Sequence, residues 1–434
     1  MEKLIYDTYV TILKTELVPA LGCTEPIAIA YAAARARQLL DGSMPDRCIV
    51  RCSGNIVKNV KGVTVPNSGG LRGIEVSAIL GFVGGDASRE LAVLESVTDA
   101  DRETTRQLLA KGICTCELVK GVENLYIDVV LVAGCHSAQV VIENYHSNIT
   151  EMRKDGQIVF QKKTGLGVSK AVTPDKGLLN VKDILEFGAT FNLDDLRETL
   201  ERQEKFNSAI SAEGLRNPYG AEVGRVLLGT RAHSEAPVKL KAKAFAAAGS
   251  DARMNGCSLP VVINSGSGNQ GITVTLPIKV YAEEYGVEHD RFLRALAVGN
   301  LIAIHQKKYI GSLSAYCGAV SAACGAGAAI TWMLGSSEMM GGTYQEVCNT
   351  ITTTIATIGG MVCDGAKASC AAKISTAVEA ALTAYQMSTR NKGFRPGEGL
   401  VKDTVEETIA SVGRMGREGM NSTDIEILNI MLGN

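Results

Sequence analysis

Apolar residues at the start of the chain recur at helical spacing. Leu4, Ile5, Tyr9, Ile12 and Leu13 form one face of a predicted amphipathic helix. An Ala-rich segment follows Pro26, a residue favoured in a first helical turn. Residues 1–40 are therefore expected to be helical.

From about residue 46 apolar and polar positions alternate instead, which is typical of strands. Three segments have this character: residues 48–53, 125–133 and 138–145. The Asp155-Gly156 pair is a strong hairpin signal. We expect an α+β domain with an antiparallel sheet over residues 45–180.

After about residue 180 the helical spacing returns. It predicts helices over residues 193–210, 290–304 and 401–412. The expected fold class is therefore α+β, a mostly helical bundle over residues 181–434 with the α+β domain inserted before it. The helices of residues 1–44 are expected to pack back onto the bundle.

Two long uncharged runs, residues 309–337 and 347–363, approach the length of a membrane span. They consist of Gly, Ala, Ser, Thr and Cys rather than Leu, Ile and Phe, and they lack flanking aromatic belts. We interpret them as closely packed helices of a protein core and expect no contact with a membrane.

Charge and cysteine content narrow the class of function. The chain has 434 residues, with 44 basic and 46 acidic side chains and a net charge of −2, so neither nucleic acid nor an anionic membrane is an expected partner. A small molecule is the expected ligand.

No signal-peptide pattern opens the chain, which favours a cytoplasmic location. In a reducing compartment, twelve cysteines point to metal-binding, catalytic or simply buried thiols rather than disulfides.

Three of these cysteines carry the most specific signal. Cys363 and Cys370 bracket an Asp364-Gly365 turn, and Cys317 or Cys324 lies on the uncharged segment upstream. Seven residues of straight helix rise about 10 Å, so the turn is needed to bring Cys363 and Cys370 to one cluster, with Asp364 expected to cap the helix that carries Cys370. We prefer Cys317 because it follows a loop. The trio Cys317, Cys363 and Cys370 predicts an iron–sulfur cluster with one iron free of protein thiolate, although three buried structural cysteines remain an alternative. A zinc site lacks a clear fourth ligand.

A polar loop predicts the place of a substrate carboxylate. It carries hydroxyl and amide side chains that donate several hydrogen bonds: Asn264, Ser265, Ser267, Asn269 and Gln270. Its Gly-x-Gly-x-x-Gly pattern is weak evidence for a dinucleotide, because the following Ile-Thr-Val-Thr-Leu-Pro does not clearly open a long helix. Asn67 and Ser68 precede two glycines in a similar segment. A tight turn between core elements is the alternative for both.

Acid–base groups are expected at two further places. Cys23 and Glu25 lie at a loop-to-helix junction, where a thiol can move a proton or bind the open iron. His305, next to Lys307 and Lys308, is the other candidate, with a helix cap as its alternative.

Taken together, these motifs resemble those of a known family. Leu-Gly-Cys23-Thr-Glu-Pro, Asn264-Ser-Gly-Ser-Gly-Asn-Gln-Gly, Ser-Ala-Tyr-Cys317-Gly and Met-Val-Cys363-Asp-Gly-Ala-Lys-Ala-Ser-Cys370 look like the L-cysteine desulfidases of the UPF0597 type. These are relatives of the iron–sulfur L-serine dehydratases, and the likeness covers nearly the whole chain. The relatives that act on serine space their last two cluster cysteines more widely.

The resemblance implies an oxygen-sensitive 4Fe-4S cluster on Cys317, Cys363 and Cys370, with substrate at the open iron. It implies β-elimination of L-cysteine to pyruvate, ammonia and hydrogen sulfide, with the loop of residues 264–271 holding the carboxylate. Cys23 is implied as a catalytic or iron-capping thiol. We also expect a homo-oligomer, a dimer.

Other functions stay open at this point. L-serine is an alternative substrate with the same cluster, although hydroxide is a poorer leaving group than thiolate. The Ser267–Gly271 segment also resembles the carboxylate loop of pyridoxal-phosphate β-eliminases, but no phosphate cradle accompanies it. A non-catalytic iron–sulfur sensor is the third alternative.

Overall fold

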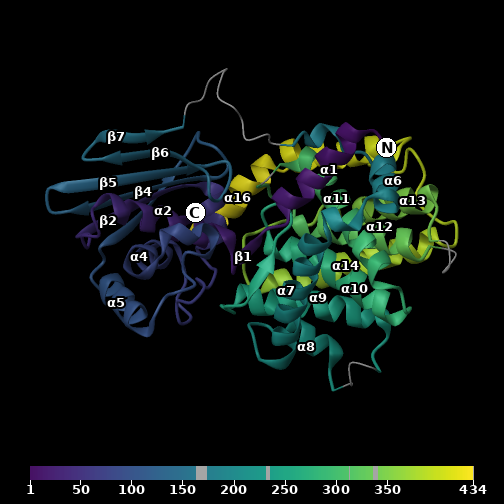
Figure 1. The fold of residues 1–434 in the computed structure, drawn as a ribbon, viewed down its shortest axis with the longest axis horizontal. Coiled ribbons are helices and arrows are strands. Elements are labelled where there is room, and N and C mark those ends of the chain that lie inside the picture. Colours follow the sequence, from purple (N-terminus) through teal and green to yellow (C-terminus); the bar gives the residue numbers. More distant parts are fainter. Residues whose placement is uncertain (163–173, 231–234, 312, 336–340, 434) are drawn as a thin grey trace.

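The protein folds as two lobes that meet around a central junction. The computed structural model describes residues 1–162, 174–230, 235–311, 313–335 and 341–433. Figure 1 shows a sheet with its helices on one side and a larger group of helices on the other, with strand β1 at the junction. The expected α+β class is confirmed.

The sheet of the smaller lobe has six strands in the order β3-β2-β4-β5-β6-β7. Their bounds are β2 Arg47–Ser53, β3 Cys114–Val119, β4 Tyr126–Ala133, β5 His136–Glu143, β6 Ile149–Lys154 and β7 Gln157–Gln161. The expected hairpin joins β6 to β7, with positive φ at Asp155 and Gly156.

The sheet is mixed rather than purely antiparallel. Strands β2 and β3 pair in parallel, whereas the other neighbours are antiparallel. The chain crosses from β2 to β3 through three helices: α3 Gly54–Val60, α4 Ile74–Gly84 and α5 Asp99–Ala110. A crossover of this length permits parallel pairing, which a two-residue hairpin does not.

Helix α2, Thr24–Leu39, belongs to the core of this lobe. It packs against α4 and against strands β4 and β5. By contrast, α1, Lys3–Glu16, contributes Tyr9, Ile12 and Leu13 to the core of the helical lobe. The expected unit of residues 1–44 is therefore divided between the lobes, because the Ala-rich surface of α2 fits the sheet.

The larger lobe is almost wholly helical, as predicted after residue 180. Its main helices are α6 Val181–Thr190, α7 Arg197–Arg216, α8 Val223–Leu228, α9 Val238–Met254, α10 Gly268–Glu284, α11 His289–Ile310, α12 Gly318–Met333, α13 Tyr344–Ile358, α14 Ser369–Ser388 and α15 Val405–Arg414. Short 3₁₀ helices lie at Ala87–Ala92 in the smaller lobe and at Lys176–Leu178 and Leu193–Asp195 in the larger one.

The uncharged runs form α12 and α13 inside this lobe. Small residues let the helices approach closely, since a Cβ on Gly325 would overlap the Gly299 carbonyl oxygen of α11. Residues 312 and 336–337 of the first run lie outside the described part of the chain. Among the described residues, no helix combines the length and apolar character needed to cross a membrane.

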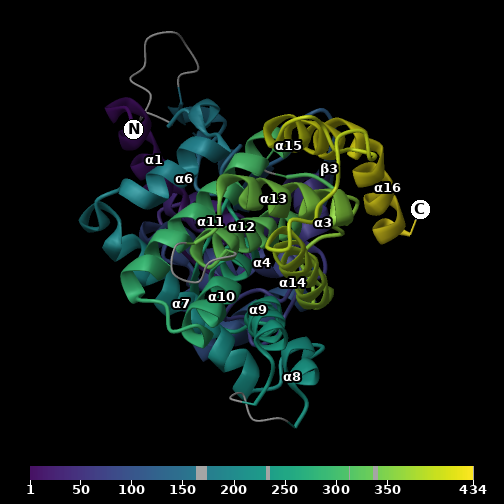
Figure 2. The same ribbon diagram turned by 90° about the vertical axis from the view of Figure 1, so that its right-hand side faces the viewer.

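Two connections join the lobes beside the site. Strand β1, Pro19–Leu21, pairs antiparallel with β8, Pro260–Val262, and these strands lead into α2 and α10. After the π-helical turn Met415–Gly419, α16 (Asn421–Leu432) packs on α3, with Lys58 paired to Asp424. Figure 2 shows α15 and α16 arching over one side of the molecule.

Candidate functional site

A cavity of about 410 Å³ is lined by residues of both lobes. Most of the candidate residues line it: Cys23, Glu25, Ser265, Ser267, Asn269, Gln270, Cys317, Cys363 and Cys370. These residues come from distant parts of the sequence. The structure therefore brings the three thiols and the polar loop to one place.

Four helices begin at this cavity. Cys23, Ser267 and Cys317 directly precede α2, α10 and α12, and Cys370 lies in the first turn of α14. The N-cap residue of each of these helices makes no side-chain capping hydrogen bond. Free backbone N–H groups and the positive ends of helix dipoles favour anions such as thiolates and carboxylates.

A short backbone bridge places Cys317 beside Cys363. Tyr316 and Val362 form an antiparallel bridge. The Cys317 amide donates to the Met361 carbonyl at 3.0 Å, and the Cys363 amide donates to the Ala315 carbonyl at 2.6 Å. Two segments far apart in sequence are thus fixed with their thiols on the same cavity.

The Asp364-Gly365 turn brings Cys370 to the same wall. Gly365 has φ +93°, and a Cβ there would overlap the Lys58 carbonyl oxygen of α3. The Cys370 thiol donates to the Gly365 carbonyl at 3.6 Å. The expected helix cap is wrong, because α14 begins at Ser369 and the Asp364 carboxylate pairs instead with Lys367 and Lys373.

Cys324, the alternative to Cys317, lies outside the cavity lining. It sits in the middle of α12, fully buried, with its thiol 3.8 Å from the Ile351 carbonyl. This environment is that of a structural cysteine.

The donor set at the cavity is suited to an iron–sulfur cluster. Burial and the neighbouring Cys363 raise the pKa of Cys317 to about 12, and burial also raises the pKa of Cys370. Neighbouring buried thiols such as these two resist ionising together unless added positive charge compensates them, which metal ions provide. Within the described residues, no three His, Cys, Asp or Glu side chains converge on a single metal ion. In a four-iron cluster each cysteine thiolate binds a different iron. The ligating sulfurs therefore surround the cluster and do not converge on a single point.

Cys23 and Glu25 form a hydrogen-bonded pair on the opposite lobe. The Cys23 thiol donates to Glu25 Oε2 at 3.2 Å, and Asn59 Nδ2 donates to Oε1 at 3.0 Å. Burial raises the pKa of Cys23 well above its usual range, and the Glu25 carboxylate adds to this. Burial also acts to raise the pKa of Glu25, but His146 and the Cys23 hydrogen bond outweigh it, so that pKa is lowered.

Several cavity residues were not predicted from the sequence. They share a buried polar atom without a hydrogen-bond partner among the described residues: Asn55 Oδ1, Asn59 Oδ1, His146 Nε2, Arg253 Nε and Tyr316 Oη, together with the predicted Asn269 Oδ1 and Gln270 Oε1. Buried polar atoms are normally paired, so this concentration indicates a polar ligand. The only local feature of the sequence that could have indicated any of these residues is the polar segment around His146, which follows a strand.

Lys307 is a further buried cation on the cavity wall. Burial lowers its pKa to about 8, although the thiols of Cys363 and Cys317 act in the opposite direction. Its neighbour Lys308 also lines the cavity and donates to the Leu179 carbonyl at 2.7 Å.

Asn264 belongs to the polar loop but is absent from the cavity lining. It is fully buried, and its Nδ2 donates to Asn300 Oδ1 at 2.9 Å. Ser265 donates to Asn264 Oδ1 at 2.9 Å. Asn264 thus anchors the loop to α11, and the structure gives no support to direct substrate contact.

Asn67 and Ser68 also lie outside the cavity lining. Asn67 Nδ2 donates to the Leu94 carbonyl at 2.9 Å, and Ser68 Oγ donates to the Leu71 carbonyl at 3.0 Å. Both side chains stabilise a turn of their own lobe, the alternative considered from the sequence. Their expected substrate contact finds no support in this geometry.

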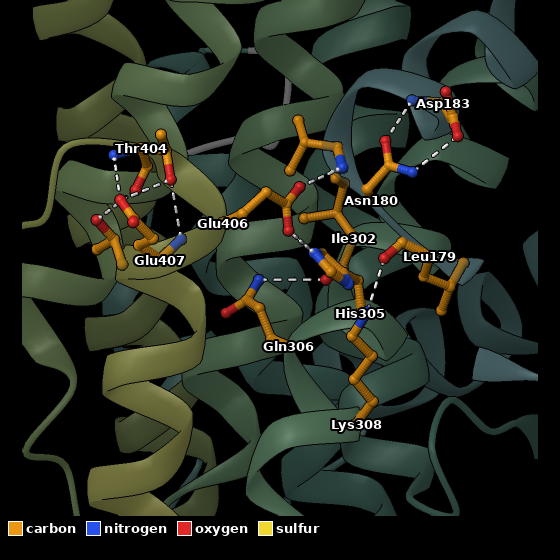
Figure 3. A network of polar contacts seen from close by, with 12 residues as sticks. Leu179, Asn180, Asp183, Ile302, His305, Gln306, Lys308, Thr404, Glu406 and Glu407 are labelled. Atoms are coloured by element: carbon orange, nitrogen blue, oxygen red, sulfur yellow. Dashed lines mark hydrogen bonds and ion pairs between the residues drawn. The ribbon is translucent and has the colours of Figure 1, made fainter. Parts of the chain in front are cut away.

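His305 is the third candidate outside the cavity lining. It is completely buried in α11, and its Nε2 lies 2.7 Å from Glu406 Oε2. Figure 3 shows the network, in which Glu406 also accepts a hydrogen bond from the Val181 amide. His305 therefore links α11, α6 and α15. A direct catalytic role is not supported by this position.

Comparison with known proteins places the chain in a family. Residues 88–429 match the family model described as serine dehydratase alpha chain. A UPF0597 protein of Lachnoclostridium phytofermentans is 49% identical over 99% of this chain and 100% of its own length. UPF0597 proteins of Treponema denticola and Finegoldia magna are 43% and 45% identical, over 100% and 98% of this chain and 99% of their own lengths.

The chain belongs to the UPF0597 family. This confirms the resemblance drawn from the motifs, and the match to serine dehydratases places this UPF0597 protein in a lyase-type family. The matched segment contains Cys317, Cys363, Cys370 and the polar loop, whereas Cys23 and Glu25 precede it. The likeness to the UPF0597 relatives extends across these two residues as well.

Proposed function

We propose that this UPF0597 protein is an iron–sulfur-dependent lyase that converts L-cysteine to pyruvate, ammonia and hydrogen sulfide. The observation that carries the proposal is the meeting of three thiols, a polar loop and a thiol–carboxylate pair in one cavity. A small amino acid fits a volume of about 410 Å³ together with a cluster.

Cys317, Cys363 and Cys370 would hold a 4Fe-4S cluster. When bound, the cluster would supply an iron that lacks a protein thiolate and acts as a Lewis acid toward the amino acid. The helix N-termini at Cys317 and Cys370 favour the thiolate form that such binding requires.

The substrate carboxylate is assigned to the start of α10. Asn269 and Gln270 lie in its first turn, and the buried Arg253 packs against Gly268. Backbone amides, side-chain amides and a guanidinium together suit a carboxylate.

His146 is our candidate for proton transfer. Its Nε2 is shielded from solvent and has no hydrogen-bond partner in the part of the chain that the structure describes, and its ring reaches across the junction to within 3.4 Å of the position of a Cβ on Gly266. Burial lowers the pKa of His146, although Glu25 acts in the opposite direction. The neutral imidazole is therefore available to accept a proton at pH 7.

L-serine with the same cluster is the second candidate, favoured by the match to the serine dehydratase alpha chain. The two substrates yield the same pyruvate and ammonia but differ in the group released. A pyridoxal-phosphate mechanism would instead need a lysine that forms a Schiff base.

The test is a product analysis on protein purified without oxygen. With L-cysteine we expect sulfide and pyruvate in equal amounts, and a lower rate of pyruvate formation with L-serine. Faster turnover of serine would favour the second candidate. Borohydride trapping of a lysine adduct, or an absence of pyruvate from both amino acids, would contradict the proposal.

A further inference from the structure

Four cysteines that do not line the cavity lie together on two neighbouring strands. Cys48 and Cys52 belong to β2, and Cys114 and Cys116 belong to β3. In the parallel register Cys48 is opposite Cys114, and Cys116 is opposite Val50. Because side chains alternate along a strand, all four thiols project from the same face of the sheet.

The thiols contact each other as two pairs. The thiols of Cys48 and Cys114 lie close enough to interact electrostatically, and so do those of Cys52 and Cys116. Cys48 and Cys52 are four residues apart on one strand, which separates them by about 13 Å. One metal ion cannot bind both, in agreement with the absence of a three-ligand metal site among the described residues.

The two pairs differ in their suitability for a disulfide. Directly opposite residues on neighbouring strands have Cα atoms about 4.8 Å apart, which lies within the range that a disulfide spans. Cys52 and Cys116 are offset by two positions in the register, which places their Cα atoms beyond about 7 Å. Of the two pairs, that of Cys48 and Cys114 is therefore the one whose Cα spacing falls within the range of a disulfide.

One member of this pair is reachable from solvent. Strand β3 is an edge strand of the sheet, and Cys114 is half-buried, whereas Cys48 is fully buried. A small reagent therefore meets Cys114 first, with Cys48 in contact behind it.

We propose that Cys48 and Cys114 form a redox-active pair that closes a cross-strand disulfide with a small-molecule disulfide such as oxidised glutathione. The Cys114 thiolate attacks one glutathione sulfur, so the glutathione S–S bond breaks and one glutathione thiol leaves. The Cys48 sulfur then displaces the second glutathione and forms the protein disulfide. Two protein thiols lose two protons and two electrons, and one glutathione disulfide becomes two thiols.

The bridge would lie next to a segment that leads to the cavity. Strand β2 continues directly into α3, whose Asn55, Lys58 and Asn59 line the cavity. A disulfide would fix β3 to β2 at Cys48, six residues before that helix begins. This inference does not depend on the proposed lyase activity.

The test uses the full-length protein equilibrated with oxidised and reduced glutathione at increasing ratios. Free thiols are blocked with iodoacetamide, and the peptides are mapped by mass spectrometry. We expect a Cys48–Cys114 crosslink that accumulates with the ratio and disappears with dithiothreitol. The neighbouring Cys48 thiol and burial raise the pKa of Cys114, so the bridge should form faster at higher pH.

Matched variants sharpen the result. Cys48→Ser should abolish the crosslink, while Cys52→Ser, on the same strand and face and equally buried, should retain it. Cys114→Ser, on the edge strand β3, provides a second loss-of-bridge variant if Cys48→Ser does not fold. A crosslink between Cys52 and Cys116 instead, or free Cys48 and Cys114 at every ratio, would overturn the proposal. Bound zinc that is lost in Cys48→Ser would also overturn it.

Discussion

The chemistry of single residues at the cavity depends on the helices and loops that carry them. Cys23 precedes a helix, is buried, and donates to the Glu25 carboxylate. Burial and this carboxylate favour its neutral thiol, whereas the helix N-terminus favours a thiolate. Its position suits a group that exchanges a proton with substrate.

Cys23→Ser should keep most of the cluster and lose at least about 10²-fold in turnover, because the proton-exchanging group is replaced by a poorer acid. Iron content and the rate of pyruvate release, measured on the same sample, check this. An equal fall in iron and rate would make Cys23 a fourth ligand of the cluster.

His146→Asn tests the proton-transfer assignment. The amide preserves polarity but accepts a proton far less readily, so kcat should fall about 10²-fold or more. Iron content and the KM for L-cysteine should stay near the wild-type values. Wild-type turnover in this variant would exclude His146 from proton transfer.

For single residues, the sequence predicted the three cysteine thiols and the polar loop but not the other side chains that line the cavity. The local sequence marks the three thiols, because turn-forming and helix-forming residues surround Cys317, Cys363 and Cys370. His146 and Arg253 carry no such signal, because only the docking of the two lobes brings them to the cavity. Asn264 and His305 lie outside the cavity lining, since a buried polar side chain can equally anchor a loop or a helix.

At the scale of elements, the turn before α14 is decisive. Gly365 lies against the α3 backbone with positive φ, and this close approach holds Cys363 and Cys370 on one wall. A side chain at this position would strain the turn and push α3 away.

Gly365→Ala should lower the free energy of unfolding by about 2–4 kcal/mol and reduce iron incorporation. Urea denaturation and iron analysis measure the two effects. Gly360→Ala is the control, because no heavy atom lies within 4 Å of its Cβ position and its φ is not positive. Equal behaviour of the two variants would contradict the role given to the turn.

Two elements differ from the pattern-based expectation for physical reasons. The segment Ile-Thr-Val-Thr-Leu-Pro277 is part of α10, although β-branched residues and proline disfavour helices. Burial of α10 against α9 and α12 outweighs that preference. Similarly, the parallel pairing of β2 with β3 depends on a crossover whose docking no local pattern reveals.

At the scale of the whole molecule, one buried network ties the helical lobe together. The neutral His305 donates from Nε2 to Glu406, and its Nδ1 is buried without a partner among the described residues. Burial lowers the pKa of His305, although Glu406 acts in the opposite direction. Protonation would place a charged N–H group where nothing accepts its hydrogen bond.

Stability should therefore fall with acidification. In the unfolded chain His305 has a pKa of about 6.5, so below that pH its ring binds a proton. In the folded protein the same ring stays neutral to a lower pH. The stabilisation that neutral His305 provides is complete above that pH. It is lost as the pH falls through the lowered pKa that His305 has in the folded protein. Urea unfolding at pH 7.5 and 5.5 should show a smaller pH effect in His305→Gln than in the wild type. An identical effect in both proteins would contradict this account.

The most direct test of the central claim is the iron and acid-labile sulfide content of protein isolated without oxygen, compared between the wild type and single thiol variants. The wild type should contain about four irons and about four sulfides per chain, and Cys317→Ser, Cys363→Ser and Cys370→Ser should each lose most of both. Cys324→Ser, from the middle of the same helix that Cys317 precedes, should retain them. Full iron and sulfide in any of the three cavity variants, or the same loss in Cys324→Ser, would contradict the account.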